Sequence, residues 1–213
     1  MNADTELKNQ LLDALAKAAD PTLIEARFNR RKGSLVFVRI QKNAKQEIAF
    51  AVDWSPKYQP DAEAHIHPMV RVSIPDVSKQ ALQLVRGNKL LLAGAPDIIV
   101  NQPIEFSAPK SAHVRWFATG KEQFEECCHG IAAFIVQWVM PLLADFASAD
   151  DLISLYESSD ARVMKQRHWF VFVAAAYQLE GRSESARKLI EEQFGSLGMR
   201  KRYAPLFESM GVS

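Results

Sequence analysis

A single long helix is the feature that most restricts how this chain can fold. Residues 119–143 read TGKEQFEECCHGIAAFIVQWVMPLL, and apolar side chains recur there every three or four residues, as on one face of a helix. This apolar face comprises Phe124, Cys128, Ile131, Ile135, Trp138 and Leu142. Thr119 followed three residues later by Glu122 fits a capping box, which predicts the start of the helix. Beyond Ile131 the other faces are apolar too, so we expect the second half of the helix to be buried on every side.

The residues before this helix alternate mainly as β-strands do. A first helix is expected over residues 4–19, ended by Asp20-Pro21, and another over residues 76–86 with Gly87 as its stop. Strands are expected over residues 23–29, 34–42, 47–54, 66–74 and 112–117. Because the first strands are joined by short turns, they predict an antiparallel meander; parallel neighbours need long crossovers. The segment 88–106 is interrupted by glycine and proline, and short strands or irregular structure are expected there.

The residues after the long helix are helical throughout. Helices are expected over residues 149–156, 168–179, 184–194 and 203–210. The fold class is therefore predicted as α+β, an antiparallel sheet covered by a long central helix and followed by an all-helical C-terminal tail. We expect two parts, an α+β sheet domain over residues 1–145 and a helical extension over residues 146–213 packed on it.

Composition excludes several classes of function. The formal net charge of +1 argues against nucleic-acid binding. Charges throughout the first twenty residues argue against a secretory signal, and the longest apolar run, residues 131–143, is shorter than the roughly 20 residues of a membrane span. Cys127 and Cys128 are adjacent on the helix, so we expect buried, reduced thiols. These observations predict a cytoplasmic protein that does not contact membranes.

Two histidines on one predicted strand are the main candidates for a chemical site. His65 and His67 share a strand face, a spacing that zinc sites use, and His113 on another strand is a possible third ligand. Arg71 and Arg115 fall on the same faces, however, and a cation beside a metal is unfavourable. The segment HIHPMVRVS also contains no carboxylate, so we predict no metal site. The alternative is a small enzyme or metal-binding protein that uses this polar sheet face.

No motif in the sequence predicts a cofactor or a catalytic nucleophile. The chain contains neither a Walker loop nor a GxGxxG motif. Cys127, Cys128 and His129 diverge by about 100° from one to the next on a helix, so they form no nucleophile–base pair among themselves. We therefore expect no bound cofactor and no catalytic residues.

Charge is unevenly distributed along the chain. Residues 122–161 contain eight acidic residues and no lysine or arginine, whereas residues 1–121 carry 17 basic and 12 acidic residues. A concentrated acidic stretch steers basic partners. We therefore predict a partner-binding surface for another protein with a basic surface, and its candidate residues are Asp145, Asp150, Asp151, Glu157 and Asp160. The alternative is neutralisation by the chain's own basic residues, either residues 30–32 or those near the C-terminus.

The segment AAAYQLEGRSESARKLIEEQF resembles a tetratricopeptide-type helical hairpin, with small residues before Tyr177, Gly181 at the turn and Ala186 on the second helix. Arrays of this kind need at least three repeats for stability, and the resemblance covers one. We therefore interpret the hairpin as a packing device, with a helical adaptor as the alternative.

The order of parts in residues 1–145 is similar to a bacterial domain family of unknown function found among toxin-neighbourhood immunity proteins. The segments that carry the resemblance are LIEARFNRRKGSLVFVRIQ, EIAFAVDW, HVRWFATG and VMPLL. The resemblance implies a helix-backed antiparallel sheet with a binding role and carries no catalytic residues. It favours a non-enzymatic protein-binding protein, an immunity-type inhibitor of a bacterial toxin.

Overall fold

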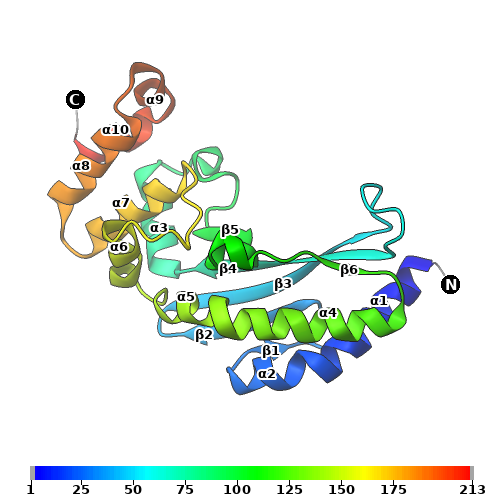
Figure 1. Ribbon diagram of the computed structural model, residues 1–213. Helices are drawn as coiled ribbons and strands as arrows, with labels where there is room; N and C mark the ends of the chain where they lie inside the picture. Colours follow the sequence, from blue (N-terminus) through cyan, green and yellow to red (C-terminus); the bar gives the residue numbers. More distant parts are fainter. Residues whose placement is uncertain (1–2, 212–213) are drawn as a thin grey trace. The chain divides into compact units, whose positions relative to one another are not determined.

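A computed structural model describes residues 3–211, and these residues form an α+β fold with an antiparallel sheet and helices at its C-terminal end, as predicted (Figure 1). The chain divides into two compact units. One contains the described residues up to Ile40, with Gln46–Arg71 and Gln102–Ala144. The other contains Gln41–Lys45, Val72–Asn101 and the described residues from Asp145 onward. The division into residues 1–145 and 146–213 stays a prediction.

The sheet has six strands in the order β1-β2-β3-β4-β5, and β6 pairs with β4. The strands are β1 (Asn29–Arg30), β2 (Val36–Gln41), β3 (Ala44–Trp54), β4 (Ala64–Ser73), β5 (Val100–Pro103) and β6 (Trp116–Ala118). Burial alternates strictly along β4, where Ile66, Val70 and Val72 are buried while His67 and Arg71 are half-buried on the opposite face. The antiparallel meander that was predicted from the short turns between the strands is confirmed, and β4 has one buried and one half-buried face.

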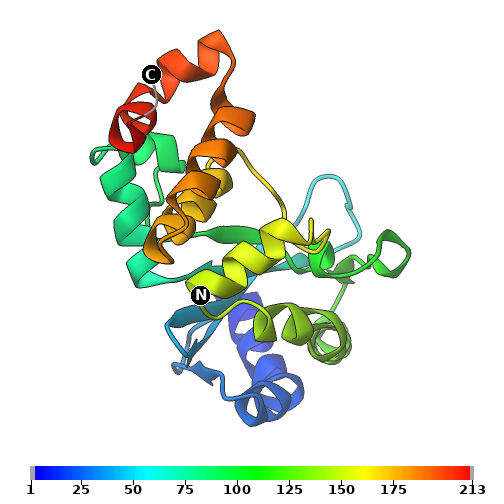
Figure 2. The same ribbon diagram turned by 90° about the vertical axis from the view of Figure 1, so that its left-hand side faces the viewer.

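The first unit places two long helices against the sheet. It contains α1 (Ala3–Ala18), α2 (Asp20–Glu25), the short 3₁₀ helices η2 (Ile104–Ser107) and η3 (Lys110–Ala112), α4 (Lys121–Phe134), the π-helical turn η4 (Ile135–Val139) and α5 (Met140–Ala144). Helices α1 and α4 pack side by side on the same side of the sheet (Figures 1 and 2). Leu11, Leu15, Phe124 and Ile131 lie among the fully buried side chains of this unit.

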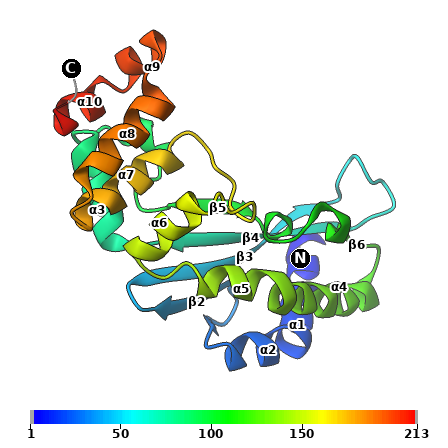
Figure 3. The same cartoon turned by 60° about the vertical axis from the view of Figure 1, so that its left-hand side comes forward.

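The second unit is mainly helical. It contains α3 (Pro75–Leu84), η1 (Lys89–Leu92), α6 (Ala149–Glu157), α7 (Trp169–Leu179), α8 (Ser183–Phe194), α9 (Leu197–Arg202) and α10 (Ala204–Met210). Helix α7 contacts α3, α6 and α8, and its residues from Val171 to Tyr177 are all buried (Figure 3). The small side chains Ala174, Ala175 and Ala176 are what allow this central position, since they let neighbouring helices approach closely.

The predicted strand over residues 23–29 is wrong. The structure has helix α2 there, with Pro21 in its first turn, and β1 begins only at Asn29. Proline lacks an N–H that the first helical turn leaves unbonded in any case, so Pro21 starts a second helix here.

The predicted start of the long helix is also wrong in detail. Gly120 is the N-cap of α4, and the Gln123 side chain accepts hydrogen bonds from Thr119 N (2.7 Å) and Thr119 Oγ1 (2.8 Å). The side-chain bond back to Thr119 that was predicted for Glu122 is therefore made by Gln123, the next residue of the chain.

The second half of the long helix is not buried on every side. Val136 is 47% exposed, and Gln137 is also exposed. Trp138 is only half-buried, although it was predicted in the core, because the helix widens to a π turn at Ile135. A π turn adds one residue per turn, which moves Val139 onto the buried face in place of Trp138.

Strands β2 and β6 bury few side chains. On β2 the buried side chain is Phe37, whereas Ile40 is 70% exposed. The predicted last strand begins later than expected, at Trp116, and Val114 before it is 47% exposed.

The segment Glu122–Ala144 is long and apolar enough, by length and composition, to cross a membrane. The apolar run of residues 131–143, which was predicted to be too short for a membrane span, is only part of this segment. Half of the most apolar window is buried within the structure, as in the core helix of a soluble protein, which passes the same test. The expectation that the protein does not contact membranes stays a prediction.

Candidate functional site

Polar and aromatic side chains gather on the half-exposed face of the sheet in the first unit. We call Asp53, Tyr58, His65, His67 and Phe117 the tyrosine–histidine cluster. Asp53 lies near the end of β3, the two histidines lie on β4, Tyr58 lies in the loop between these strands, and Phe117 lies on β6. His65 and Phe117 are direct neighbours in the register of β4 and β6.

The β3–β4 hairpin brings the carboxylate to the histidines. Ser55 N donates to Glu63 O at 2.8 Å, which pairs these two residues across the hairpin. Two residues further from the loop on each strand, Asp53 and His65 are opposite each other. Side chains that are opposite in an antiparallel pair share a face and lie about 5 Å apart at Cβ. The meander therefore supplies a carboxylate that His65 and His67 lack on their own strand.

A chain of hydrogen bonds runs through the cluster. Tyr58 Oη donates to Asp53 Oδ2 at 2.9 Å and lies 2.7 Å from His65 Nδ1. The hydroxyl has one hydrogen, so His65 Nδ1 carries the proton of the second bond and donates it to Tyr58 Oη. This tautomer leaves the lone pair on His65 Nε2. His67 Nε2 is buried without a hydrogen-bond partner and lies 3.5 Å from Asp53 Oδ2.

Ring contacts hold the same side chains together. The His65 ring stacks on Phe117 with centroids 4.5 Å apart and 24° between the planes. Tyr58 meets His65 edge-on at 5.8 Å, and the two histidine rings are 5.2 Å apart. Edge-on and offset-stacked arrangements are the preferred ones for aromatic pairs. Tyr58 is nevertheless 59% exposed, so the cluster holds in place a large side chain that solvent reaches.

The local environment sets the charges of the cluster. The hydrogen bond from Tyr58 lowers the pKa of Asp53, and the neighbouring histidines lower it further. Partial burial raises the pKa of Tyr58, and so does its bond to Asp53. Partial burial also lowers the pKa of His65, as does the charge of His67, while Asp53 opposes this shift. At neutral pH the cluster therefore contains an Asp53 carboxylate, a neutral Tyr58 and a neutral His65.

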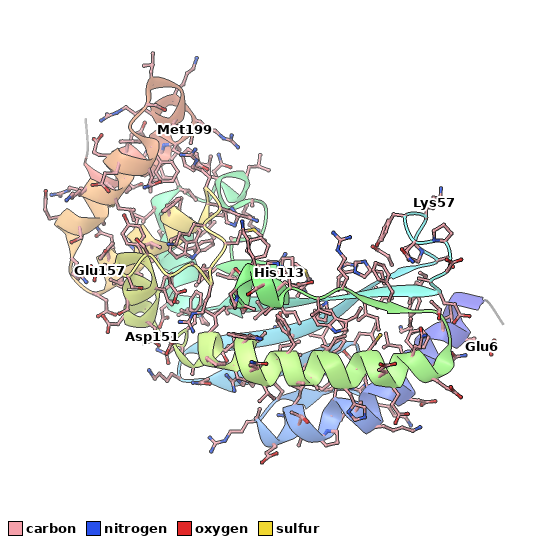
Figure 4. The ribbon with its side chains drawn as sticks, viewed as in Figure 1. Glu6, Lys57, His113, Asp151, Glu157 and Met199 are labelled. Atoms are coloured by element: carbon pink, nitrogen blue, oxygen red, sulfur yellow. The ribbon has the colours of Figure 1, made fainter. Side chains whose placement is uncertain are left out.

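The structure brings together only some of the predicted polar-face residues. His65 and His67 share a face, as predicted, while His113 lies in the exposed connection between η3 and β6 (Figure 4). Arg115 is close enough to His65 to lower its pKa, and Arg71 lies four residues beyond His67 on the same face of β4. Within residues 3–211, no group of three or more histidine, cysteine, aspartate or glutamate side chains is arranged to hold a metal ion.

The two cysteines are free and buried. Burial raises the pKa of the Cys128 thiol to about 12 and also raises that of Cys127, which lies close to Glu126. The thiolate is the reactive form of cysteine, so neither side chain is a nucleophile near neutral pH.

Four of the five acids predicted to bind a partner contact basic residues of the second unit. Arg162 pairs with Asp145 at 2.9 Å and with Asp160 at 2.7 Å. Asp151 lies 3.5 Å from Lys42 Nζ, and Glu157 pairs with Arg182 (Figure 4). Asp150 is exposed in the first turn of α6. These pairs favour internal neutralisation, chiefly by Arg162 and Arg182 in the C-terminal part of the chain, and partner binding by the acids stays a prediction.

Comparison of the chain with family models, with curated proteins and with solved structures found no match. The resemblance to immunity-type domains and to a tetratricopeptide-type hairpin is therefore neither supported nor excluded by known relatives. The assignment of function depends on the geometry of the described residues.

We expect the His65 imidazole to titrate below its ordinary pKa of 6.5. Between the folded and unfolded pKa values the unfolded chain binds more protons, so the contribution of His65 to stability falls as pH drops through about 6.5. NMR titration of the His65 ring signals measures this midpoint. Asp53→Asn should lower the midpoint further because it removes a negative charge, whereas Asp61→Asn, in the exposed part of the hairpin loop, should leave it unchanged. A midpoint above 6.5 in the unmodified protein contradicts the assigned environment.

We expect Asp160→Asn to destabilise the second unit by about 1–2 kcal/mol at pH 7, because Asp160 accepts charged hydrogen bonds from Arg162 and its side chain is only 14% exposed. Burial raises the pKa of Asp160, but the Arg162 bonds outweigh it and the net shift is downward. The stability that Asp160 provides is therefore present above pH 3.8 and is lost as pH falls through its folded pKa. Urea unfolding at several pH values measures the effect. Asp150→Asn is the control for an exposed acid and should change stability by less than about 0.5 kcal/mol.

Proposed function

We propose that the protein is a non-enzymatic protein-binding protein and that it contacts its partner through the tyrosine–histidine cluster. The observation that carries this proposal is Tyr58, a large aromatic side chain that is 59% exposed yet held by Asp53 and His65. Tyrosine is among the residue types that contribute most to binding energy at protein interfaces. A side chain fixed before binding loses little conformational entropy when the complex forms, so its contacts add more to affinity.

The partner that we propose is a bacterial toxin, which the protein inhibits in the bacterial cytoplasm by covering its functional surface. Two features support this choice: segments of residues 1–145 resemble those of immunity-type domains, and the tyrosine–histidine cluster lies on the half-exposed face of the sheet. The proposal requires no chemistry from the protein, which agrees with the raised thiol pKa values and the open position of the cluster.

A second candidate, a small enzyme, is favoured by one observation. The bonds from His65 to Tyr58 and from Tyr58 to Asp53 leave His65 Nε2 unprotonated at neutral pH, as a general base requires. His65→Gln would then abolish turnover of a substrate while leaving partner binding intact. If His65→Gln instead loses partner binding and keeps its turnover, His65 has the binding role.

The proposed function is tested with a toxin encoded beside this gene in the producing host. Coexpression of the protein should protect cells from that toxin, and the purified pair should form a complex in solution. Tyr58→Ala should weaken the complex by about 30-fold or more, the effect of losing one interface residue that contributes roughly 2 kcal/mol. The control is Ile40→Ala, which removes an apolar side chain that is 70% exposed on β2, away from the cluster, and should leave the affinity unchanged. A folded Tyr58→Ala protein that binds with unchanged affinity rules out the cluster as the contact surface.

A further inference from the structure

A pocket of about 360 Å³ lies in the first unit between strand β6 and helix α4. The strand side of the pocket contains Arg115 and Phe117, and the helix side contains Gln123, Glu126, Cys127 and Gly130. Its volume falls within the range of pockets that bind small ligands or peptide side chains. Phe117 belongs both to this pocket and to the tyrosine–histidine cluster, so the two sites are continuous.

The backbone of β6 presents hydrogen-bonding groups to this pocket. Strand β6 pairs with β4 through one edge, and in the described part of the chain no other strand pairs with it. Ala118 O accepts a bond from Glu63 N at 2.8 Å, so it points toward the β4 side. Neighbouring residues of a strand direct their N–H and C=O groups to opposite edges, so those of Phe117 point away from β4. Phe117 O accepts a long contact from the Cys127 thiol, at 3.5 Å, and a thiol is a weak donor.

The helix side of the pocket has no side chain at Gly130, where α4 comes close to Trp116. A Cβ at this position would lie 3.4 Å from Nε1 of Trp116. Gln123 is turned toward Thr119, from which it accepts two hydrogen bonds. PDZ and PTB domains bind extended peptides by adding a strand to an exposed edge of a sheet.

We propose that the groove between β6 and α4 binds an extended segment of the partner, which pairs with the free edge of β6 as an additional antiparallel strand. This inference rests on the proposed function and specifies how the partner is held. The N–H and C=O of Phe117 exchange two hydrogen bonds with one residue of the segment, and the Cys127 thiol gives up its weak contact. Since β6 has three residues, the paired part of the segment is about as short.

The side chains around the groove define the chemistry of the segment. Arg115 is exposed directly before β6 and, like Phe117, lies close to His65, so we infer that the partner residue opposite Arg115 is acidic. The residue opposite Phe117 is aromatic or β-branched, because such side chains pack best on a ring across a sheet. The residue between them points to the α4 side and is small. The inferred ligand is therefore an extended segment with an acidic residue two positions from an apolar one.

The inference is tested with a display library of random dodecapeptides selected on the full chain. Peptides of the inferred pattern should be enriched, and hydrogen exchange at the Phe117 amide should slow when they bind. Methylation of the backbone nitrogen of the peptide residue opposite Phe117 should weaken binding by tenfold or more, since it removes the donor to Phe117 O. A library that yields no binder, or binders unaffected by this methylation, overturns the inference.

Two variants of the protein test the groove itself. Gly130→Gln fills the groove, and Arg115→Glu repels the acidic residue of the peptide; each should weaken binding by tenfold or more, and a peptide with lysine in place of its acid should restore binding to Arg115→Glu. The control is Ala133→Gln, which adds the same side chain to an exposed position of α4 outside the pocket and should change nothing. If Gly130→Gln fails to fold, the binding of peptides to Arg115→Glu decides whether the groove is the binding site.

The same variants separate this inference from the proposed function. If the toxin complex is weakened by Tyr58→Ala but not by Gly130→Gln or Arg115→Glu, the cluster is the contact surface and strand addition is wrong. If the groove variants weaken a complex that Tyr58→Ala leaves intact, strand addition stands and the role of the cluster is wrong.

Discussion

Replacing Ile135 by alanine should lower the free energy of unfolding of the first unit by about 2–5 kcal/mol. Ile135 is fully buried, and it is the first residue of the π-helical turn that packs against η2. Truncation removes three carbon atoms from the core and leaves a cavity that the widened helix and the 3₁₀ turn beside it fill only in part. The cost should lie in the upper half of the range if the π turn keeps its shape and in the lower half if the helix tightens around the smaller side chain.

Val136→Ala is the matched control for Ile135→Ala. Val136 is the next residue of the same turn, but it is 47% exposed, so its truncation should cost less than about 1 kcal/mol. Three of the four tryptophans, Trp54, Trp116 and Trp138, belong to the first unit, so fluorescence during urea unfolding mainly reports this unit. Equal midpoints for the two variants would mean that Ile135 does not face the core.

Local alternation was sufficient to predict the centre of the sheet. Along β4, residues from Ala64 to Ser73 alternate between buried and half-buried positions, and the sequence shows the same alternation of apolar and polar side chains. In a strand that packs on one face, buried and exposed side chains must alternate, because successive side chains point to opposite faces of the sheet. The C-terminal end of α3 was also predictable from the sequence. Gly87 follows the helix with a φ of 79°, a conformation that favours glycine and ends helices.

The errors arose where a residue has two structural uses. Pro21 ends one helix and starts another, but only the end of the first helix was predicted from it. Thr119 fits the N-cap pattern, yet Gln123 rather than Glu122 makes the reciprocal bond. The π turn at Ile135 leaves no sign in the order of apolar residues, because its extra residue arises from packing rather than from local preference.

The candidate site depends on pairing between strands, which explains why only part of it was predicted. His65 and His67 are two residues apart on one strand, so their shared face follows from the sequence alone. Asp53 and Tyr58 are brought to them by the register of the hairpin, which the pair Ser55–Glu63 defines. A search of the neighbouring strand, and not only of HIHPMVRVS, would have found the carboxylate opposite His65.

Replacing Arg30 by methionine should destabilise the first unit by about 2–4 kcal/mol, because it breaks an ion pair with little access to solvent. Arg30 Nε and Nη2 lie 2.8 and 2.6 Å from the two carboxylate oxygens of Asp20, and the two side chains are 9% and 21% exposed. Arg30 Nη1 also donates to Ser34 O at 3.0 Å, so the guanidinium joins the first turn of α2 to the turn between β1 and β2. Loss of one partner leaves the Asp20 carboxylate without its counter-charge, and this penalty exceeds the net gain of forming the pair.

A double-mutant cycle separates this penalty from the loss of packing. Methionine is an apolar side chain of similar length, so it still covers the Phe37 ring, over which the Arg30 guanidinium carbon lies 5.4 Å from the centroid. Asp20→Asn added to Arg30→Met should therefore recover part of the lost stability, because the uncompensated charge is gone. Arg31→Met is the control, since Arg31 is exposed in the adjacent turn and its replacement should change stability by less than about 0.5 kcal/mol. If Arg30→Met costs no more than Arg31→Met, the pair is a surface ion pair in solution and α2 is held by the burial of Leu23 alone.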